Sequence, residues 1–164
     1  MRHIVKPGNI YKVVLENGAV RFFQFIGKDR TELNSDVIKI FARHYNSSDN
    51  PNVETILHDD TECYMHTIVQ VGIKLGYWEK FCSAKAIIEA PIFFRTSQDV
   101  GLFPKQHFIS HRWVVWEMNG EWSEVGELPV AHHKTDIGGV YAPVHIIYRL
   151  QTGEIPDKYY PSYE

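Results

Sequence analysis

The sequence contains little cysteine and no long apolar run, and both absences exclude whole classes of protein. Its 164 residues include two cysteines, Cys63 and Cys82, and no CxxC pair. This pattern excludes a disulfide-rich scaffold, so we expect both cysteines to be free thiols. A run of roughly 18 apolar residues, the length needed to span a membrane, is absent. The opening "MRHIVKPGNIYK" also lacks the apolar stretch of about 7 to 15 residues that a signal peptide needs. We therefore expect a cytoplasmic protein.

Basic residues are slightly outnumbered and are nowhere clustered. There are 17 lysines and arginines against 20 aspartates and glutamates, which gives a formal net charge of -3. Binding to a phosphate backbone requires several concentrated positive charges. The composition thus argues against nucleic acid as the main partner and favours a cationic one. No repeat, low-complexity tract or linker divides the chain, so residues 1–164 are predicted to form a single domain.

The sequence also lacks the local motifs of catalysis and of cofactor binding. It has no GxSxG nucleophile elbow, no GxxxxGK[ST] loop and no GxGxxG that follows a predicted strand. No catalytic and no cofactor-binding residue is therefore predicted. A catalytic site assembled only in space would not be detected in this way.

Two histidine-containing segments could supply metal ligands, but neither has a diagnostic spacing. His107 and His111 in "HFISH" are spaced as zinc ligands on a helix are, without the glutamate of HExxH that activates water. The segment "HDDTECYMH", residues 58–66, is interpreted as an acidic surface turn that leads into a buried strand. No metal-binding residue is predicted, and a structural ion at either segment is left open. The possible ligands of the second segment are His58, Asp59, Asp60, Glu62, Cys63 and His66.

Two Asn-Gly pairs give the clearest local structural signals. Asn17-Gly18 and Asn119-Gly120 each lie between apolar or aromatic runs, the pattern of a β-hairpin closed by a type I′ turn. Before the second pair, "WVVW" at 113–116 places large apolar side chains on both faces of a strand, which predicts a central strand.

The remaining elements are predicted from glycine and proline positions. Residues 66–81 are predicted as strand, turn and strand, because Gly72 and Gly76 would each cost a helix roughly 1 kcal/mol. One short helix is predicted in "APVHIIYRLQTGEIP", with Pro143 at its start and Gly153 after its end, a strand at "VHIIY" being the alternative. The fold class is α+β and β-dominated, with antiparallel hairpins forming a twisted sheet or an SH3-like partial barrel and one or two short helices.

The second hairpin also offers a candidate binding surface. Trp122 follows the Asn-Gly pair and is surrounded in the sequence by glutamates, which include Glu121 and Glu124. Tryptophan is enriched at interaction hot spots, and the carboxylates would complement a basic partner. Glu121, Trp122 and Glu124 are therefore the candidate partner-binding residues, with a solvated hairpin edge as the alternative interpretation.

Several short patterns, in this order along the chain, resemble the bacterial immunity protein 26 family. They are "KPGNIYKVVLENGAVRFFQFIGKD", "HTIVQVGIKLGYWEKF", "PIFF", "HRWVVWEMNGEW" and "VHIIYRLQTGEIPDKYYP". The most specific are the PG(D/N)I(F/Y) opening, where Asn9 replaces the expected aspartate, the G-x-WEK turn and the tryptophan strand. The resemblance implies an α+β protein of a polymorphic-toxin system that binds and neutralises a cognate toxin domain without catalysis. From the charge, that toxin domain is expected to be basic.

Two functions of other classes are kept as alternatives. The first is a small metal-dependent hydrolase that uses His58, Asp60, His66 or His107. The second is an SH3-like module that binds nucleic acid or carbohydrate through exposed aromatic side chains. Neither alternative has a specific motif in its favour.

Overall fold

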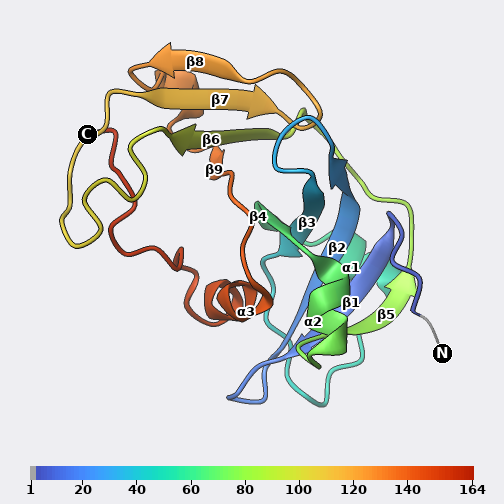
Figure 1. Cartoon of the computed structure of the whole chain (residues 1–164). Helices are drawn as coiled ribbons and strands as arrows, with labels where there is room; N and C mark the ends of the chain where they lie inside the picture. The colour runs from blue at the N-terminus through green and yellow to red at the C-terminus, as the bar shows by residue number, and fades with distance from the viewer. Residues whose placement is uncertain (1–2) are drawn as a thin grey trace.

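A computed structural model describes residues 3–164, and its strands form two sheets (Figure 1). The first sheet is antiparallel, with strand order β4-β3-β2-β1-β5. The bounds of its strands are β1 Asn9–Val14, β2 Val20–Asp29, β3 Ser35–Phe41, β4 Thr61–Thr67 and β5 Glu79–Ser83.

The second sheet has the order β8-β7-β6-β9, and its short edge strand β9 runs parallel to β6. Its strands are β6 Phe93–Ser97, β7 Trp113–Glu117, β8 Ser123–Gly126 and β9 Asp136–Ile137. The described residues also form three short α-helices and a 3-10 turn, which are α1 Val53–Leu57, α2 Val69–Lys74, α3 Pro143–Thr152 and η1 Val130–His132. The predicted β-dominated α+β class is confirmed. None of the helices in residues 3–164 has the length and apolar character needed to cross a bilayer.

Both Asn-Gly hairpins are present, but neither turn is type I′. In the first hairpin only Gly18 has a positive φ, +83°, and its N–H donates to the carbonyl of Leu15. Asn17 instead accepts a hydrogen bond from the N–H of Ala19 through its side chain. In the second hairpin Asn119 has a φ of +63° and the following glycine does not have a positive φ. The sequence correctly located both hairpins, whereas the predicted turn type was wrong because each turn places one residue, not two, in the left-handed region.

The segment 66–81 differs from the prediction because a helix replaces the expected turn. Strands β4 and β5 are separated by α2, which contains Gly72 in its buried face. A Cβ on Gly72 would lie 1.9 Å from Cζ2 of Trp78. The Trp78 indole N–H donates to the carbonyl of Val69, 3.0 Å away. Glycine is therefore needed so that an aromatic ring can lie directly against the helix, and this packing outweighs its low helix propensity.

The predicted C-terminal helix is present as α3 and covers one face of the first sheet. Pro143 lies in its first turn, and Gly153, with φ +72°, ends it in the left-handed conformation. Ile146 and Leu150 are fully buried in a core that they share with strands β1 to β4. The predicted central strand at 113–116 is also present, because β7 lies between β6 and β8 with both faces buried.

The end of α3 also provides a partner for a cation buried in β2. Arg21 is fully buried, and its guanidinium donates to the carbonyls of Leu150 at 2.8 Å and Phe41 at 2.7 Å. Glu62 lies between two arginines, 3.2 Å from Nη2 of Arg21 and 3.1 Å from Nε of Arg149. A buried charge is costly unless it is paired and hydrogen-bonded. This group of contacts therefore fastens β2, β4 and α3 together.

The two sheets are joined by a buried polar network around Asp29. Its Oδ2 accepts hydrogen bonds from His66 Nε2 and Trp116 Nε1, each at 2.9 Å, and its Oδ1 accepts from the Asn119 N–H at 3.0 Å. Burial alone would raise the pKa of Asp29, but these hydrogen bonds outweigh it and hold that pKa below its ordinary value. Burial lowers the pKa of His66 despite its carboxylate partner. The network thus contains an ionised aspartate and a neutral histidine that donates from Nε2.

We expect Gly18→Ala to lower the free energy of unfolding by about 1 kcal/mol, because an L-residue is strained at positive φ. No neighbouring heavy atom lies within 4 Å of a Cβ at Gly18, so the loss would come from the backbone alone. Gly139→Ala is the matched control, since Gly139 also has open space around it and no positive φ. Urea unfolding measures both, and equal midpoints for the two variants would contradict the strained turn.

Trp116→Phe should cost roughly 2 kcal/mol more stability than Trp113→Phe, because a hydrogen bond to a charged group contributes more than one to a neutral group. Both indoles are buried, but Trp116 donates to the Asp29 carboxylate and Trp113 to the carbonyl of Ser110. Thermal or urea unfolding of the two variants gives the comparison. A larger loss for Trp113→Phe would show that the network does not join the sheets as described.

Candidate functional site

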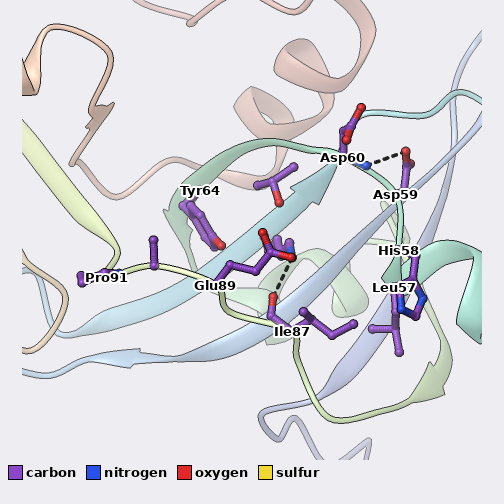
Figure 2. Close-up of a pocket in the computed structure, with 11 residues that line it drawn as sticks. Leu57, His58, Asp59, Asp60, Tyr64, Ile87, Glu89 and Pro91 are labelled. Atoms are coloured by element: carbon purple, nitrogen blue, oxygen red, sulfur yellow. Dashed lines mark hydrogen bonds between the residues drawn. The ribbon is translucent and has the colours of Figure 1, made fainter.

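A polar cavity of about 300 Å³ lies between the first sheet and the segment that connects β5 to β6 (Figure 2). Strands β3 and β4 and the end of α1 form one side of it, and residues 87–91 form the other. Figure 2 shows Tyr64 and Glu89 at one end of the cavity and His58 and Asp59 at the other. The residues that line it are Lys39, Leu57, His58, Asp59, Asp60, Thr61, Tyr64, Ile87, Glu89, Ala90 and Pro91.

Lys39 is the unusual residue of this cavity because its side chain is buried in the middle of β3. It shares a face of the strand with Val37 and Phe41, which are both buried in the core. The segment 84–92 covers this face, so the lysine is only 6% exposed. A lysine is almost never buried to this extent unless it is paired.

The environment of Lys39 lowers the pKa of its amine. Burial lowers its pKa, and the charge of Glu89 opposes that change. Nζ donates to the carbonyl of Ile87 at 2.9 Å and lies 5.5 Å from the centre of the Phe41 ring. A perturbed amine in a cleft is a recognised mark of a functional site. The arrangement can bind a small polar ligand.

The possible metal ligands of residues 58–66 are not brought together. His58, Asp59 and Asp60 line the cavity, whereas Glu62 pairs with Arg21 and Arg149. His66 is hydrogen-bonded to Asp29 in the network between the two sheets. Among the described residues, no group of three or more His, Cys, Asp or Glu side chains is arranged to hold a metal ion.

The other histidines and the two cysteines are also separate. His107 is exposed beside Tyr159, and His111 pairs with Glu127 at 2.6 Å on the surface. The segment that carries both histidines is not helical, so the helical i, i+4 geometry does not apply. Cys63 and Cys82 are free thiols, and burial raises the pKa of Cys63 to about 12, so it stays protonated at neutral pH.

The predicted binding residues lie on the surface of the second sheet. Trp122 is 40% exposed and stacks on the buried Trp116, with ring centres 5.8 Å apart and planes inclined by 10°. Glu121 and Glu124 are exposed on either side of it, and Glu124 accepts a hydrogen bond from Gln98. The aromatic ring is therefore held in one orientation while one face of the hairpin carries free carboxylate oxygens.

Trp122 also borders an apolar groove of about 430 Å³ that no sequence pattern indicated. The groove runs between the second sheet and the segment that connects β9 to α3. Gly138 permits this close approach, because a Cβ there would lie 2.2 Å from the Trp116 ring. Apolar residues dominate its lining, and they are Leu33, Val100, Trp116, Trp122, Ile137, Val140, Tyr141 and Tyr160.

Leu33, from the β2–β3 loop, also lines this groove, and the loop has a strained conformation. Leu33 and Asn34 have φ values of +59° and +42°, which L-residues rarely adopt. The loop is held against the second hairpin by two hydrogen bonds, from the Arg30 N–H to the Asn119 side chain and from the Thr31 hydroxyl to the Gly120 carbonyl. Leu33 is consequently displayed at 39% exposure beside the groove.

A second perturbed acid, Asp136 in β9, lies where the two sheets meet. Its Oδ2 accepts a hydrogen bond from the Tyr64 N–H at 2.8 Å. Burial raises its pKa to about 6, and Arg149 and Arg95 oppose that rise. The space beside it is only about 20 Å³, enough for about one water molecule. Asp136 therefore has a structural role rather than a substrate-binding one.

Sequence reasoning did not identify Lys39 or the groove. The available signal for Lys39 was its position as the single basic residue within the apolar run "VIKIF". The groove gave no signal, since its sides come from segments that are distant in the sequence. Comparison with known protein families, with curated proteins and with solved structures finds no match.

We expect Asp136→Asn to make the protein more stable than wild type at pH 7, by roughly 3 kcal/mol, and about equally stable below about pH 3. A carboxyl with a raised folded pKa stabilises the fold below its unfolded pKa of 3.8, and this contribution is lost as the pH rises through about 6. Asparagine keeps the acceptor for the Tyr64 N–H without the charge. Urea unfolding of variant and wild type at both pH values measures the difference in stability. The titration of His66 contributes equally to both proteins and therefore cancels. Glu154→Gln is the surface control. A destabilised asparagine variant at pH 7 would contradict the raised pKa.

Proposed function

We propose that this protein is a bacterial immunity protein that binds a cognate, basic toxin domain in the cytoplasm and neutralises it without catalysis. The proposal rests on the resemblance to the immunity protein 26 family and on the character of the second hairpin. Immunity of this kind requires complementarity of shape and charge to one partner. It does not require turnover of a substrate.

The observation that carries the proposal is the position of Trp122. A large aromatic side chain that is half-exposed, stacked on a buried ring and next to an apolar groove has the features of an interaction hot spot. Stacking on Trp116 reduces the side-chain entropy that binding would otherwise cost. Leu33, which lines the same groove, adds apolar area to this surface.

The charge around Trp122 favours a basic partner. Four exposed glutamates lie on or next to the hairpin in the sequence, and none of them pairs with a lysine or arginine within residues 3–164; they are Glu117, Glu121, Glu124 and Glu127. Exposed carboxylates at the rim of an interface accelerate the encounter with a cationic protein. The same charges would repel a phosphate backbone, which weighs against the nucleic-acid alternative.

The test uses the C-terminal domain of the secreted protein encoded in the neighbouring reading frame, in a catalytically inactive form. Trp122→Ala should weaken binding by about 30-fold or more, mainly through faster dissociation, because a hot-spot side chain contributes about 2 kcal/mol or more. Replacing both Glu121 and Glu124 by Gln should slow association at low salt and change dissociation little. Surface plasmon resonance at two salt concentrations separates the two effects.

Matched controls come from other surfaces of the protein. Tyr148→Ala removes an aromatic side chain of similar exposure from α3, and Glu79→Gln removes an exposed charge from β5. Both should bind as wild type does. Unchanged binding by the hairpin variants would exclude the hairpin as the interface, and absence of any binding by the wild-type protein would refute the immunity function.

A further inference from the structure

The cavity of Figure 2 contains a buried cation that the protein itself satisfies only in part. The ammonium of Lys39 has three N–H donors. One donates to the carbonyl of Ile87 at 2.9 Å. Among the described residues no carboxylate lies within ion-pair distance of Nζ. Since Lys39 lines the cavity, a group inside the cavity can accept the remaining N–H bonds.

The opposite charge is concentrated at the rim. Glu89 and Asp60 are exposed, line the same cavity and make no ion pair with another described residue. Asp59 differs, because its two carboxylate oxygens already accept the N–H groups of Arg43 and Asp60. The cavity is therefore positive at its floor and negative at its rim.

This arrangement of charge restricts the ligand. An anion without a positive group would be attracted to Lys39 but repelled by Glu89 and Asp60. A simple cation would be attracted to Glu89 and Asp60 but repelled by Lys39. A ligand with both charges can place a carboxylate against the ammonium and its own ammonium against a rim carboxylate. A volume of about 300 Å³ is at the lower end of ligand pockets, which suits a small molecule.

We propose that this cavity binds a small zwitterion of the α-amino-acid type. The ligand carboxylate pairs with Lys39, and the ligand ammonium faces the Glu89 carboxylate. This site is separate from the second hairpin and does not depend on the proposed immunity function. Pairing with the ligand also compensates the desolvation of the lysine, which a single carbonyl and the Phe41 ring do only partly.

The experiment is a titration of the full chain, labelled with ¹⁵N, with each proteinogenic amino acid in turn at millimolar concentration. At least one should shift the backbone amide signals of the cavity residues in a saturable way. Acetate and methylamine serve as probes of the two halves of the ligand. The amino acid should bind more tightly than either, and equal binding by acetate would overturn the zwitterion.

Three variants connect binding to the named groups. Lys39→Met keeps the length and apolar stem of the side chain and should abolish binding, while its folding is checked by the same spectra. Glu89→Gln should weaken binding by about tenfold, the effect of losing one charged contact. Glu16→Gln, an exposed glutamate in the β1–β2 turn, is the control and should change nothing. The proposal fails if no amino acid shifts the cavity signals, or if Lys39→Met binds as well as wild type.

Discussion

The carboxylate of Asp29 joins the two sheets of the structure. It is fully buried at the end of β2 and receives one donor from β4, one from β7 and one from the turn after β7. Removing one partner from a buried charge typically costs about 3–5 kcal/mol, because the charge is then left uncompensated. The requirement that these donors converge fixes the position of the second sheet on the first. It also keeps the imidazole of His66 fully buried between the two sheets.

The candidate binding surface depends on the same carboxylate. Trp116 donates to Asp29 on one side and supports the ring of Trp122 on the other. The turn that contains Asn119 donates its backbone N–H to Asp29 and accepts the Arg30 N–H through its side chain. Hairpin and β2–β3 loop are thus held by a rigid interior. A surface built in this way pays little ordering entropy when a partner binds, which is how preorganised interfaces reach high affinity.

Turn and cap residues made the hairpins, the central strand β7 and the helix α3 predictable, because their signals lie within a few neighbouring positions. The helix α2 was missed, since the need for glycine at Gly72 is set by the ring of Trp78, a contact that exists only after folding. The exposure of Trp122 was anticipated, but the groove beside it was not, because Leu33 and the other lining residues come from distant segments. Lys39 was overlooked for a similar reason. Its burial is caused by the segment 84–92, whose path over β3 no local pattern specifies.

The hydrogen bond from Arg21 to the Leu150 carbonyl near the end of α3 has a consequence for biosynthesis. Strands β1 to β5 leave the ribosome first and pair mainly with sequence neighbours, so the first sheet can begin to form early. The guanidinium of Arg21 in β2, however, can bond to the Leu150 carbonyl only after almost the whole chain has been synthesised. Until then the sheet carries an incompletely compensated charge and an uncovered apolar face that Ile146 will later fill. A shortened chain that stops before α3 would therefore resemble a nascent chain and be a target for chaperones and proteases rather than a smaller working protein.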